Sequence, residues 1–478
     1  MMKRKENKFN NIKLLLILFL LFAVVSWLFI ATTYKSGELV EIGWYRAGFY
    51  DLIAVIFSGF TYKINDVLYL LFVGGMYGLL TRAESYKRIV SKVSNVVREH
   101  GEIAFLLITF VVGLYTALSS SVITLFIFVP FIMTVFLKGG YDKLTAVAAS
   151  FGGLFLGYIG QITGTYGNDF LYQYLQVTAS ADVIVKVVLF VVAYVLFNVF
   201  GISHLKNNRI EEDEDLETDL YAVEEPKKIV KKSQQIMMWP TIVMAVILLV
   251  ITIIGYIPWV DAFGITFFDK LHSALMSFEV AGVKIVSTLI GTTATAIGKW
   301  EDFLPVIFVA CLMLLVVIIT NRISFKEVCD SFGEGVKKIF KVAAMYAVAF
   351  AFFYLMIAYP WPTAVVDWFI KTDSYNVMFI LLGLIAATLA TAFCVDPLYS
   401  GYYYGPYLAA IYTVNVGITA ILWRLGSSMA LLVAPTSFLL LAALTYADIP
   451  YQKWMKYIWK FALTFFVVAV IILSVVIV

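Results

Sequence analysis

The chain has 478 residues, of which 62% are hydrophobic and only 14% are charged. An average soluble domain has about 25% charged residues, because its solvated exterior needs polar side chains. These values exclude a soluble enzyme, a nucleic-acid-binding domain and a disordered scaffold. Long continuous apolar runs predict an all-α polytopic membrane protein rather than a barrel. The net charge of +3 indicates no particular partner.

The first elements form a scaffold that we assign to residues 1–101. A basic N-terminal segment precedes the apolar run Leu14–Ile30, which is long and lacks an obvious cleavage site. We therefore expect an uncleaved first helix with the N-terminus in the cytoplasm. A second span, Val67–Leu80, follows Asp66, which we expect to be solvated at the span end. Residues 81–101 predict a basic amphipathic helix on the cytoplasmic face.

Residues 102–203 contain the first predicted hairpin. Two apolar segments, Ile103–Leu118 and Val122–Leu137, are separated by the serines Ser119, Ser120 and Ser121. Lysines follow the second segment, so both ends of this pair face the cytoplasm. The pattern predicts a re-entrant hairpin with a serine tip.

A predicted broken helix follows the first hairpin. Residues 160–169 contain three glycines and several polar side chains within ten positions. Such a segment does not hold a regular helix in lipid, so we expect the helix to break at membrane depth. The polar side chains of this break are Thr163, Thr165, Asn168 and Asp169.

The second half repeats this order after a charged linker. Residues 204–236 are acidic and then lysine-rich, which predicts a cytoplasmic linker; we expect a solvated tether, and leave a regulatory role open. Scaffold helices follow at 237–372. The final segment, 373–478, contains a hairpin tip at Asp396 and a broken helix whose break spans residues 434–437.

The two halves indicate an inverted repeat. Aligning Pro130 with Pro406 places the serine tip on the Asp396 tip and the glycine-rich break beside Pro435. The distribution of lysine and arginine makes the first hairpin enter from the cytoplasm and the second from outside. Helices with a central Ser or Pro also occur in packed bundles. Four interruptions at matching places, however, are typical of a secondary transporter with a midplane site.

One carrier group has a similar C-terminal signature. In that group Pro-Thr-Ser is followed by an apolar helix and a Pro-Tyr-x-Lys-Trp turn, and here these are Pro435-Thr436-Ser437 and Pro450-Tyr451-Gln452-Lys453-Trp454. Gly140-Tyr141-Asp142-Lys143-Leu144 is also similar. The chain therefore resembles the anaerobic four-carbon dicarboxylate carrier-like family, which includes arginine/ornithine antiporters and belongs to the ion transporter superfamily. The likeness in layout covers most of the chain, but it is specific only near these stretches.

The resemblance implies an elevator-type carrier, in which a moving domain holds both hairpins and both broken helices, and which is commonly a homodimer. The chain departs from the family at three places. Relatives often have an acidic residue where this chain has Arg424–Ser428, and Asn where it has Leu431. Relatives also often hold acids in the first hairpin tip, where this chain has serines. The substrate and coupling ion can therefore differ from those of better-known members.

The tips and breaks supply the candidate site residues. Backbone N–H groups at a half-helix end attract carboxylates, and C=O groups attract cations. Hydroxyl side chains can bind an anionic group or a sodium ion, although each can also bond to its own helix. The substrate-binding candidates are Ser119, Ser120, Ser121, Thr163, Thr165, Asn168, Asp396, Tyr399, Ser427, Thr436 and Ser437. The ion-coupling candidates are Asp169 and Asp396.

Asp396 is the most specific candidate, because a carboxylate at membrane depth is costly and indicates a functional site. It could bind a substrate ammonium group, a proton or a metal cation. The alternatives are a helix N-cap or an ion pair with Arg424. Arg424 could itself meet a substrate carboxylate or extend to the interface. Tyr399 belongs to a tyrosine cluster that lines the cavity or forms an interfacial belt.

These patterns predict a secondary active transporter of the cell membrane with its C-terminus outside. We expect exchange of an amino acid, basic ones included, or of a small organic acid, because Asp396 and the hydroxyl-rich tips suit ammonium and carboxylate groups. The alternatives are a sodium- or proton-coupled dicarboxylate carrier, with Arg424 as the good cationic candidate, and a channel or passive facilitator. The scattered cysteines and histidines predict no metal, no cofactor and no enzyme. The expected partners are a small-molecule substrate, a coupling ion, the lipid bilayer and a second copy, with no nucleic acid.

Overall fold

The computed structural model describes residues 11–119, 121–164, 167, 169–178, 181–209, 219–226, 238–370, 376–413 and 416–477. Helices dominate these residues, and the strands form only two small two-stranded sheets. Within the described chain, seven helices are long and apolar enough to cross a membrane, and one bent pair would make an eighth. This confirms an all-α polytopic membrane protein; the inverted repeat, the re-entrant hairpins and the elevator mechanism stay predictions.

The elements of the first half are α1 (Asn11–Ser26), β1 (Ala31–Lys35), β2 (Glu38–Gly43), α2 (Phe49–Tyr62), α3 (Ile64–Leu80), α4 (Glu84–Leu118), η1 (Ile123–Ile127), α5 (Val129–Lys138), α6 (Lys143–Ile159), α7 (Asp169–Leu175) and α8 (Val183–Asn207). Those of the second half are α9 (Trp239–Gly255), α10 (Trp259–Phe263), α11 (Phe267–Ser277), β3 (Glu279–Val280), β4 (Val283–Lys284), α12 (Ile285–Ile290), α13 (Leu304–Asn321), α14 (Phe325–Ala358), α15 (Pro362–Ile370), α16 (Val377–Cys394), α17 (Pro397–Ile411), α18 (Val416–Val433), α19 (Phe438–Tyr446) and α20 (Tyr451–Ile477).

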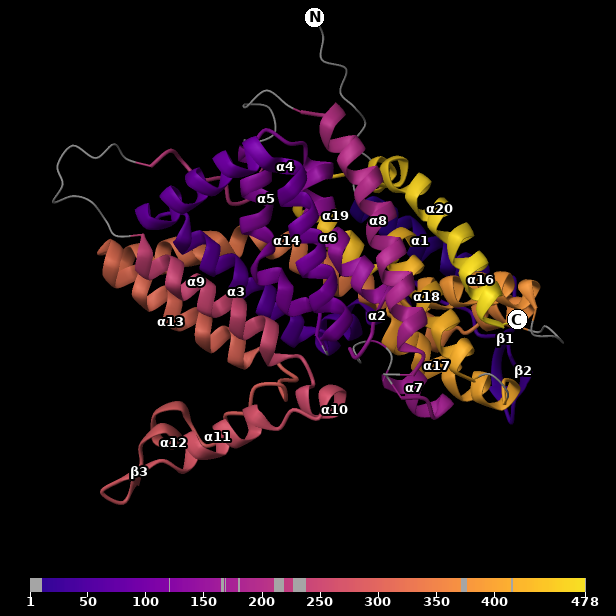
Figure 1. The fold of residues 1–478 in the computed structure, drawn as a ribbon. Coiled ribbons are helices and arrows are strands. Elements are labelled where there is room, and N and C mark those ends of the chain that lie inside the picture. Colours follow the sequence, from indigo (N-terminus) through magenta and orange to yellow (C-terminus); the bar gives the residue numbers. More distant parts are fainter. Residues whose placement is uncertain are drawn as a thin grey trace, which may run out of the picture.

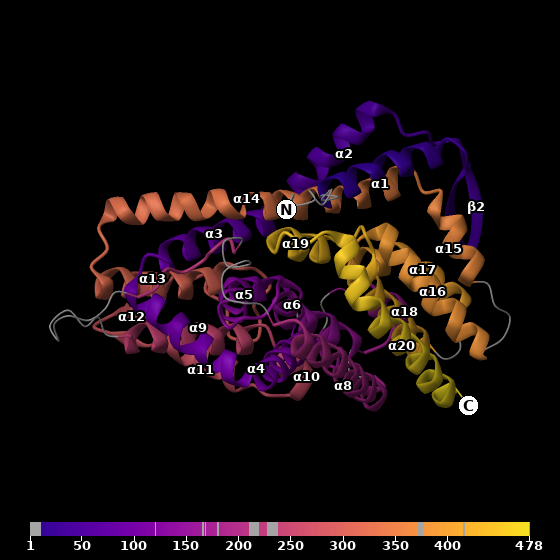
Figure 2. The same cartoon turned by 90° about the horizontal axis from the view of Figure 1, so that it is seen from above.

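The helices α3 and α14 form a close pair along one side of the molecule (Figure 2). Glycines allow this approach, because a Cβ on Gly78 would lie 2.2 Å from the carbonyl oxygen of Ser331. A Cβ on Gly335 would likewise lie 2.2 Å from the carbonyl oxygen of Gly74. Backbone atoms cannot move aside as a flexible side chain can, so both helices need glycine at these contacts.

One expected boundary, near residue 101, falls inside a continuous helix. The amphipathic helix predicted over 81–101 and the first arm of the hairpin form the single helix α4, with a non-helical residue at His100 (φ −126°, ψ 38°). The short apolar segment before Lys63 forms α2, which meets α3 at a 66° bend. The two together form a bent element that is long enough to span.

The segment containing α10, α11 and α12 extends away from the main helical body (Figure 1). Its helices bury no residues, and large apolar side chains such as Phe267 and Leu289 are exposed. The remaining helices pack around a core in which α4, α6 and α8 contact one another and α18 contacts α6. This core brings the two halves of the chain together.

The expectation of a solvated tether is wrong for Tyr221 and Val223, which are buried, whereas Glu224 and Glu225 in the same stretch are exposed. Tyr221 is buried, and its hydroxyl donates to the carbonyl oxygen of Gly335 at 2.9 Å. Thr134 on α5 donates to Asp219 at 2.7 Å. Burial raises the pKa of Asp219 despite this hydrogen bond. These contacts fasten one stretch of the predicted linker to α14 and to α5.

Candidate functional site

The first tip and the first break pack directly on each other. The carbonyl oxygen of Ala117, at the end of α4, accepts the N–H groups of Ile162, Thr163 and Gly164 at 2.8, 3.3 and 3.1 Å. The hydroxyl of Thr163 donates to the carbonyl oxygen of Leu118 at 3.4 Å. Backbone groups released by the break therefore find partners at the end of the neighbouring helix, as buried amides require.

The serine tip is closed by its own side chain. The hydroxyl of Ser119 donates to the carbonyl oxygen of Ser121 at 2.8 Å and accepts the N–H of Ser121 at 3.0 Å. Both serines are buried. Asp169, in contrast, is exposed as the first residue of α7. The predicted site residues Ser120, Thr165 and Asn168 lie outside the described residues.

Arg424 on α18 crosses to the first break, where it caps the carbonyl end of α6. Its guanidinium donates from Nη1 to the carbonyl oxygen of Gln161, and from Nη2 to that of Ile159 at 3.2 Å. The side chain is buried, so it does not extend to the interface. In the part of the chain that the structure describes, no ion pair joins it to Asp396, and its Nε has no hydrogen-bond partner.

A second buried basic side chain lies on α8. Lys186 on α8 is 2% exposed, and its charge interacts repulsively with that of Arg424. The Lys186 ammonium group lies 5.4 Å from the centre of the Tyr172 ring. The sequence prediction missed this residue, although a lone lysine within the apolar run after Val183 was a usable signal. Lysine at membrane depth is rare and is associated with function.

The second tip presents a buried carboxylate. Asp396 is 1% exposed and caps α17, because its Oδ1 accepts the N–H of Leu398 at 2.8 Å. Pro397 then occupies the first turn, where its missing N–H costs nothing. Among the described residues, Oδ2 of Asp396 has no hydrogen-bond partner. Val395 has φ 70°, a left-handed conformation that a β-branched residue rarely adopts.

The hydroxyls of the second break are bonded locally. Thr436 donates to the carbonyl oxygen of Ala392 on α16 at 2.5 Å. Ser437 donates to the carbonyl oxygen of Leu431 at 2.9 Å and caps α19. Ser427 shares a 2.7 Å hydrogen bond with a threonine hydroxyl of α16. These side chains therefore join α16, α18 and α19.

The first break also touches the second tip. A Cβ on Gly167 would lie 3.1 Å from the Cβ of Pro397, and Gly167 itself has φ 80°. A Cβ on Gly401 would lie 3.1 Å from Leu171 on α7. Together with the Arg424 contacts, these approaches bring predicted site segments of both halves into one region.

A lysine from the predicted scaffold faces the second tip. The Lys63 ammonium group, at the bend between α2 and α3, lies 3.3 Å from Asp66 Oδ2. Tyr346 donates to the same carboxylate at 2.7 Å, so the expectation that Asp66 is solvated is wrong. Tyr399 is buried, and its ring centre lies 5.7 Å from the Lys63 ammonium group. The ring centres of Tyr399 and Phe353 are 4.3 Å apart.

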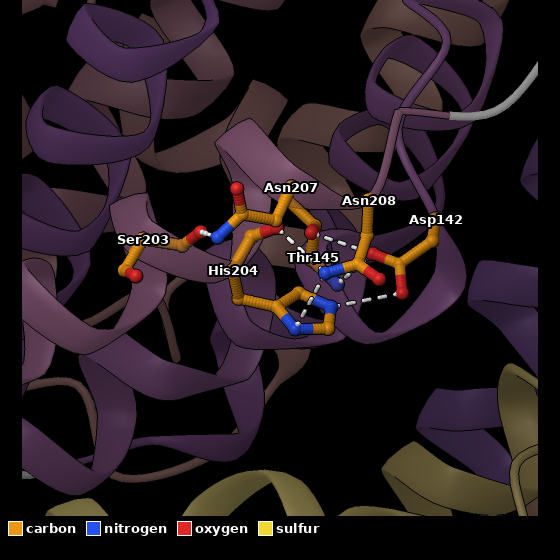
Figure 3. Close-up of polar contacts among 6 residues, drawn as sticks. All are labelled: Asp142, Thr145, Ser203, His204, Asn207 and Asn208. Carbon is orange, nitrogen blue, oxygen red and sulfur yellow. Dashed lines mark hydrogen bonds and ion pairs between the residues drawn. The ribbon is translucent and has the colours of Figure 1, made fainter.

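A separate polar cluster joins the start of α6 to the end of α8 (Figure 3). Asp142 caps α6 by accepting the N–H of Thr145 at 2.9 Å, and its other oxygen lies 3.0 Å from Nε2 of His204. Burial opposes ionisation of Asp142, but the hydrogen bonds from His204 and Thr145 lower its pKa below the usual value. This cluster fixes a helix end and lies apart from the tips. In the described chain no cluster of His, Cys, Asp and Glu could hold a metal ion.

Comparison with known proteins gives one family. The family described as C4-dicarboxylate anaerobic carrier matches residues 9–478. No curated protein matches. Two solved structures align at 13% identity: the antimetabolite efflux pump MtrF of Neisseria gonorrhoeae (98% of this chain, 94% of that chain, TM-score 0.41), and the YdaH transporter of Alcanivorax borkumensis (97% of both, TM-score 0.38).

Proposed function

Because the chain belongs to the C4-dicarboxylate anaerobic carrier family, we propose that it moves a small dicarboxylate across the membrane by alternating access. It is a membrane carrier of small organic acids and not an enzyme. The observation that most supports a dianionic substrate is the presence of two buried basic side chains, Arg424 at the first break and Lys186 on α8.

The charge of this pair favours an anion. Two like charges in a low-dielectric interior repel each other strongly, and each loses hydration. A dicarboxylate would add negative charge for both cations, in addition to that of Asp182, which also interacts with Lys186. Arginine suits carboxylates through its planar donors, whereas lysine acts as a compact point charge. The two Nη atoms of Arg424 donate to the carbonyl oxygens of Ile159 at the end of α6 and of Gln161 in the break, while Nε has no partner among the described residues.

The contacts between the halves support a moving unit. Arg424 is bonded to the first break, and Gly167 lies against Pro397 of the second tip. A rigid displacement would keep these contacts only if both tips and both breaks moved together. The glycine-packed pair α3 and α14 would then act as the fixed partner. This is the elevator arrangement that we propose.

Counterflow in proteoliposomes tests the substrate class. Vesicles are loaded separately with unlabelled succinate, arginine, ornithine or a neutral amino acid, and uptake of the matching labelled compound is followed. We expect transient accumulation with succinate only. Accumulation with amino acids alone would contradict a dicarboxylate substrate, and non-saturable flux without counterflow would indicate a channel.

Variants of Lys186 test the role of the paired cations. Lys186→Gln removes the charge, and we expect succinate counterflow to fall by about tenfold or more, the effect of losing one close charge interaction. Lys186→Arg keeps the charge and should retain more activity. Lys299→Gln is the matched control, because Lys299 forms an exposed ion pair with Asp269 in the distant α10–α12 segment. Equal counterflow in Lys186→Gln and wild type would exclude a binding role for Lys186.

An amino acid is the second candidate substrate. The observation that favours it is the carboxylate of Asp396, whose Oδ2 is buried and has no hydrogen-bond partner within the described residues. An ammonium group would satisfy that oxygen. Counterflow of arginine or ornithine that Asp396→Asn abolishes, with none for succinate, would support this candidate over the dicarboxylate.

A further inference from the structure

Lys63 occupies an unusual position for a charged residue. It is the junction residue of the 66° bend between α2 and α3, within a candidate membrane span, and its side chain is only 12% exposed. A lysine at such a place is costly unless it is paired and indicates a functional site. Within the described residues its ion-pair partner is Asp66, three residues further on.

Aromatic rings from the predicted scaffold and from the predicted moving domain surround the Lys63 ammonium group. It lies 4.7 Å from the ring centre of Phe350 on α14 and 5.8 Å from that of Tyr62 at the end of α2. It also lies 5.7 Å from Tyr399 on α17 and 5.8 Å from Phe438 at the start of α19. Ring faces attract cations at such distances. The ammonium group therefore contacts the elements that follow the second tip and the second break.

The charge of Lys63 also reaches the second tip. The Lys63 ammonium group lies 5.7 Å from the ring centre of Tyr399, three residues beyond Asp396, and its charge is opposite to that of Asp396. Asp66 carries a like charge, and Cys394 is a further titratable side chain at the tip. This region thus holds one ammonium group and two carboxylates. Only Asp66 is in ion-pair contact with it, whereas Oδ2 of Asp396 has no hydrogen-bond partner in the described residues. A buried, ionised carboxylate with an unused oxygen lacks most of the stabilisation it had in water.

We propose that the positive charge of Lys63 offsets the negative charge of Asp396 in this conformation. During transport a monovalent cation, either a proton or sodium, binds to Asp396 and offsets that charge in place of Lys63. Lys63, Asp66 and Asp396 carry one positive and two negative charges when ionised, and a dicarboxylate nearby adds two more negative charges. A cation at Asp396 Oδ2 offsets part of this charge. This inference rests on the proposed carrier function, since movement of the tip away from the α2–α3 bend would leave Lys63 with Asp66.

Cation-dependent stability of the purified protein tests the proposal without substrate. The unfolding midpoint in detergent is measured against sodium, with choline chloride holding ionic strength constant, and separately against pH. Removing the competing charge by Lys63→Gln or Lys63→Met should lower the half-saturating cation concentration by about tenfold. Lys63→Arg and the exposed control Lys299→Gln should match wild type. The sodium and pH series identify which cation binds.

Asp396→Asn completes the test. It should remove the cation dependence both alone and combined with Lys63→Gln, because it removes the ligand itself. The proposal is wrong if neutral Lys63 variants leave the half-saturating concentration unchanged, if Asp396→Asn retains the dependence, or if no variant responds to either cation. Succinate counterflow is measured separately. If wild type shows no succinate counterflow but still binds the cation, the proposed substrate is wrong and the proposed cation site at Asp396 is retained.

Discussion

The two tip-and-break regions have the same parts but very different polar chemistry. At the first, the Ala117 carbonyl takes three N–H groups of the break, Ser119 closes the tip, and Arg424 caps α6. At the second, Asp396 uses one oxygen as a cap and has no partner for the other among the described residues. The first region is thus closed by internal bonds, whereas the second holds a buried carboxylate that is only partly hydrogen-bonded within the described residues.

The difference indicates a division of labour. A closed network stabilises a break that would otherwise expose backbone groups to lipid. An incompletely bonded carboxylate lowers stability and is retained where binding requires it. We therefore expect substitutions at the first region to affect folding most, and those at the second to affect ligand response most.

The largest contrast should come from Arg424 and Asp396. Arg424→Ala removes two charge-assisted hydrogen bonds and leaves a buried cavity, so the free energy of unfolding should fall by about 3 kcal/mol or more. Asp396→Asn keeps an N-cap acceptor and removes a buried charge, so its unfolding midpoint should match or exceed that of wild type. Thermal unfolding in detergent measures both. If Asp396→Asn lowered the unfolding midpoint more than Arg424→Ala, the second region would be the one that contributes more to stability.

The contact between the two regions should contribute an intermediate amount. Gly167→Ala places a Cβ 3.1 Å from that of Pro397, at a residue with φ 80°. The cost should be about 1–2 kcal/mol from the left-handed conformation and the crowding. Gly264→Ala is the matched control, because Gly264 has φ 67° and nothing lies within 4 Å of its Cβ position. Equal unfolding midpoints for the two variants would mean that the approach to Pro397 adds no crowding cost.

Hydroxyl removal should have a smaller effect that still separates the regions. Ser119→Ala loses the internal tip bonds and Thr436→Val loses the bond to Ala392, each worth about 1 kcal/mol. Both should lower the unfolding midpoint by similar small steps. Cation response should stay as in wild type for Ser119→Ala. A shift in the cation response for Ser119→Ala would place the first tip in the ion site.

The smallest effect should come from Asp142, which lies outside both regions. Its pKa is lower in the folded protein than in the unfolded chain, so its stabilising contribution is complete above the unfolded pKa of about 3.9 and is lost as pH falls through the folded pKa. The unfolding midpoint of wild type should therefore decline more steeply below about pH 4 than that of Asp142→Asn. Parallel curves for the two proteins would show that the His204 contact adds no stability.

The sequence alone predicted the membrane class and the main interruptions of the helices. Apolar runs longer than a bilayer core and polar gaps such as Ser119–Ser121 and residues 434–437 are local signals, readable without contacts. Asp396 was also identified, with its capping alternative, because a carboxylate before proline is itself a local pattern. The family signature near Pro435 led to the carrier class.

Partner choice was decided only by the tertiary structure. Arg424 was expected to pair with Asp396, to extend to the interface or to meet a substrate carboxylate. The structure shows that it caps the carbonyl end of α6, more than 260 residues earlier in the chain, and its contact with a substrate stays a proposal. Asp66 was expected to be solvated, yet it is paired with Lys63 and Tyr346. Lys63 and Lys186 were not singled out, because neither a short helix bend nor one lysine in an apolar run shows what faces it. Charge and hydropathy are properties of a residue, whereas compensation of a buried charge depends on which segments fold against it.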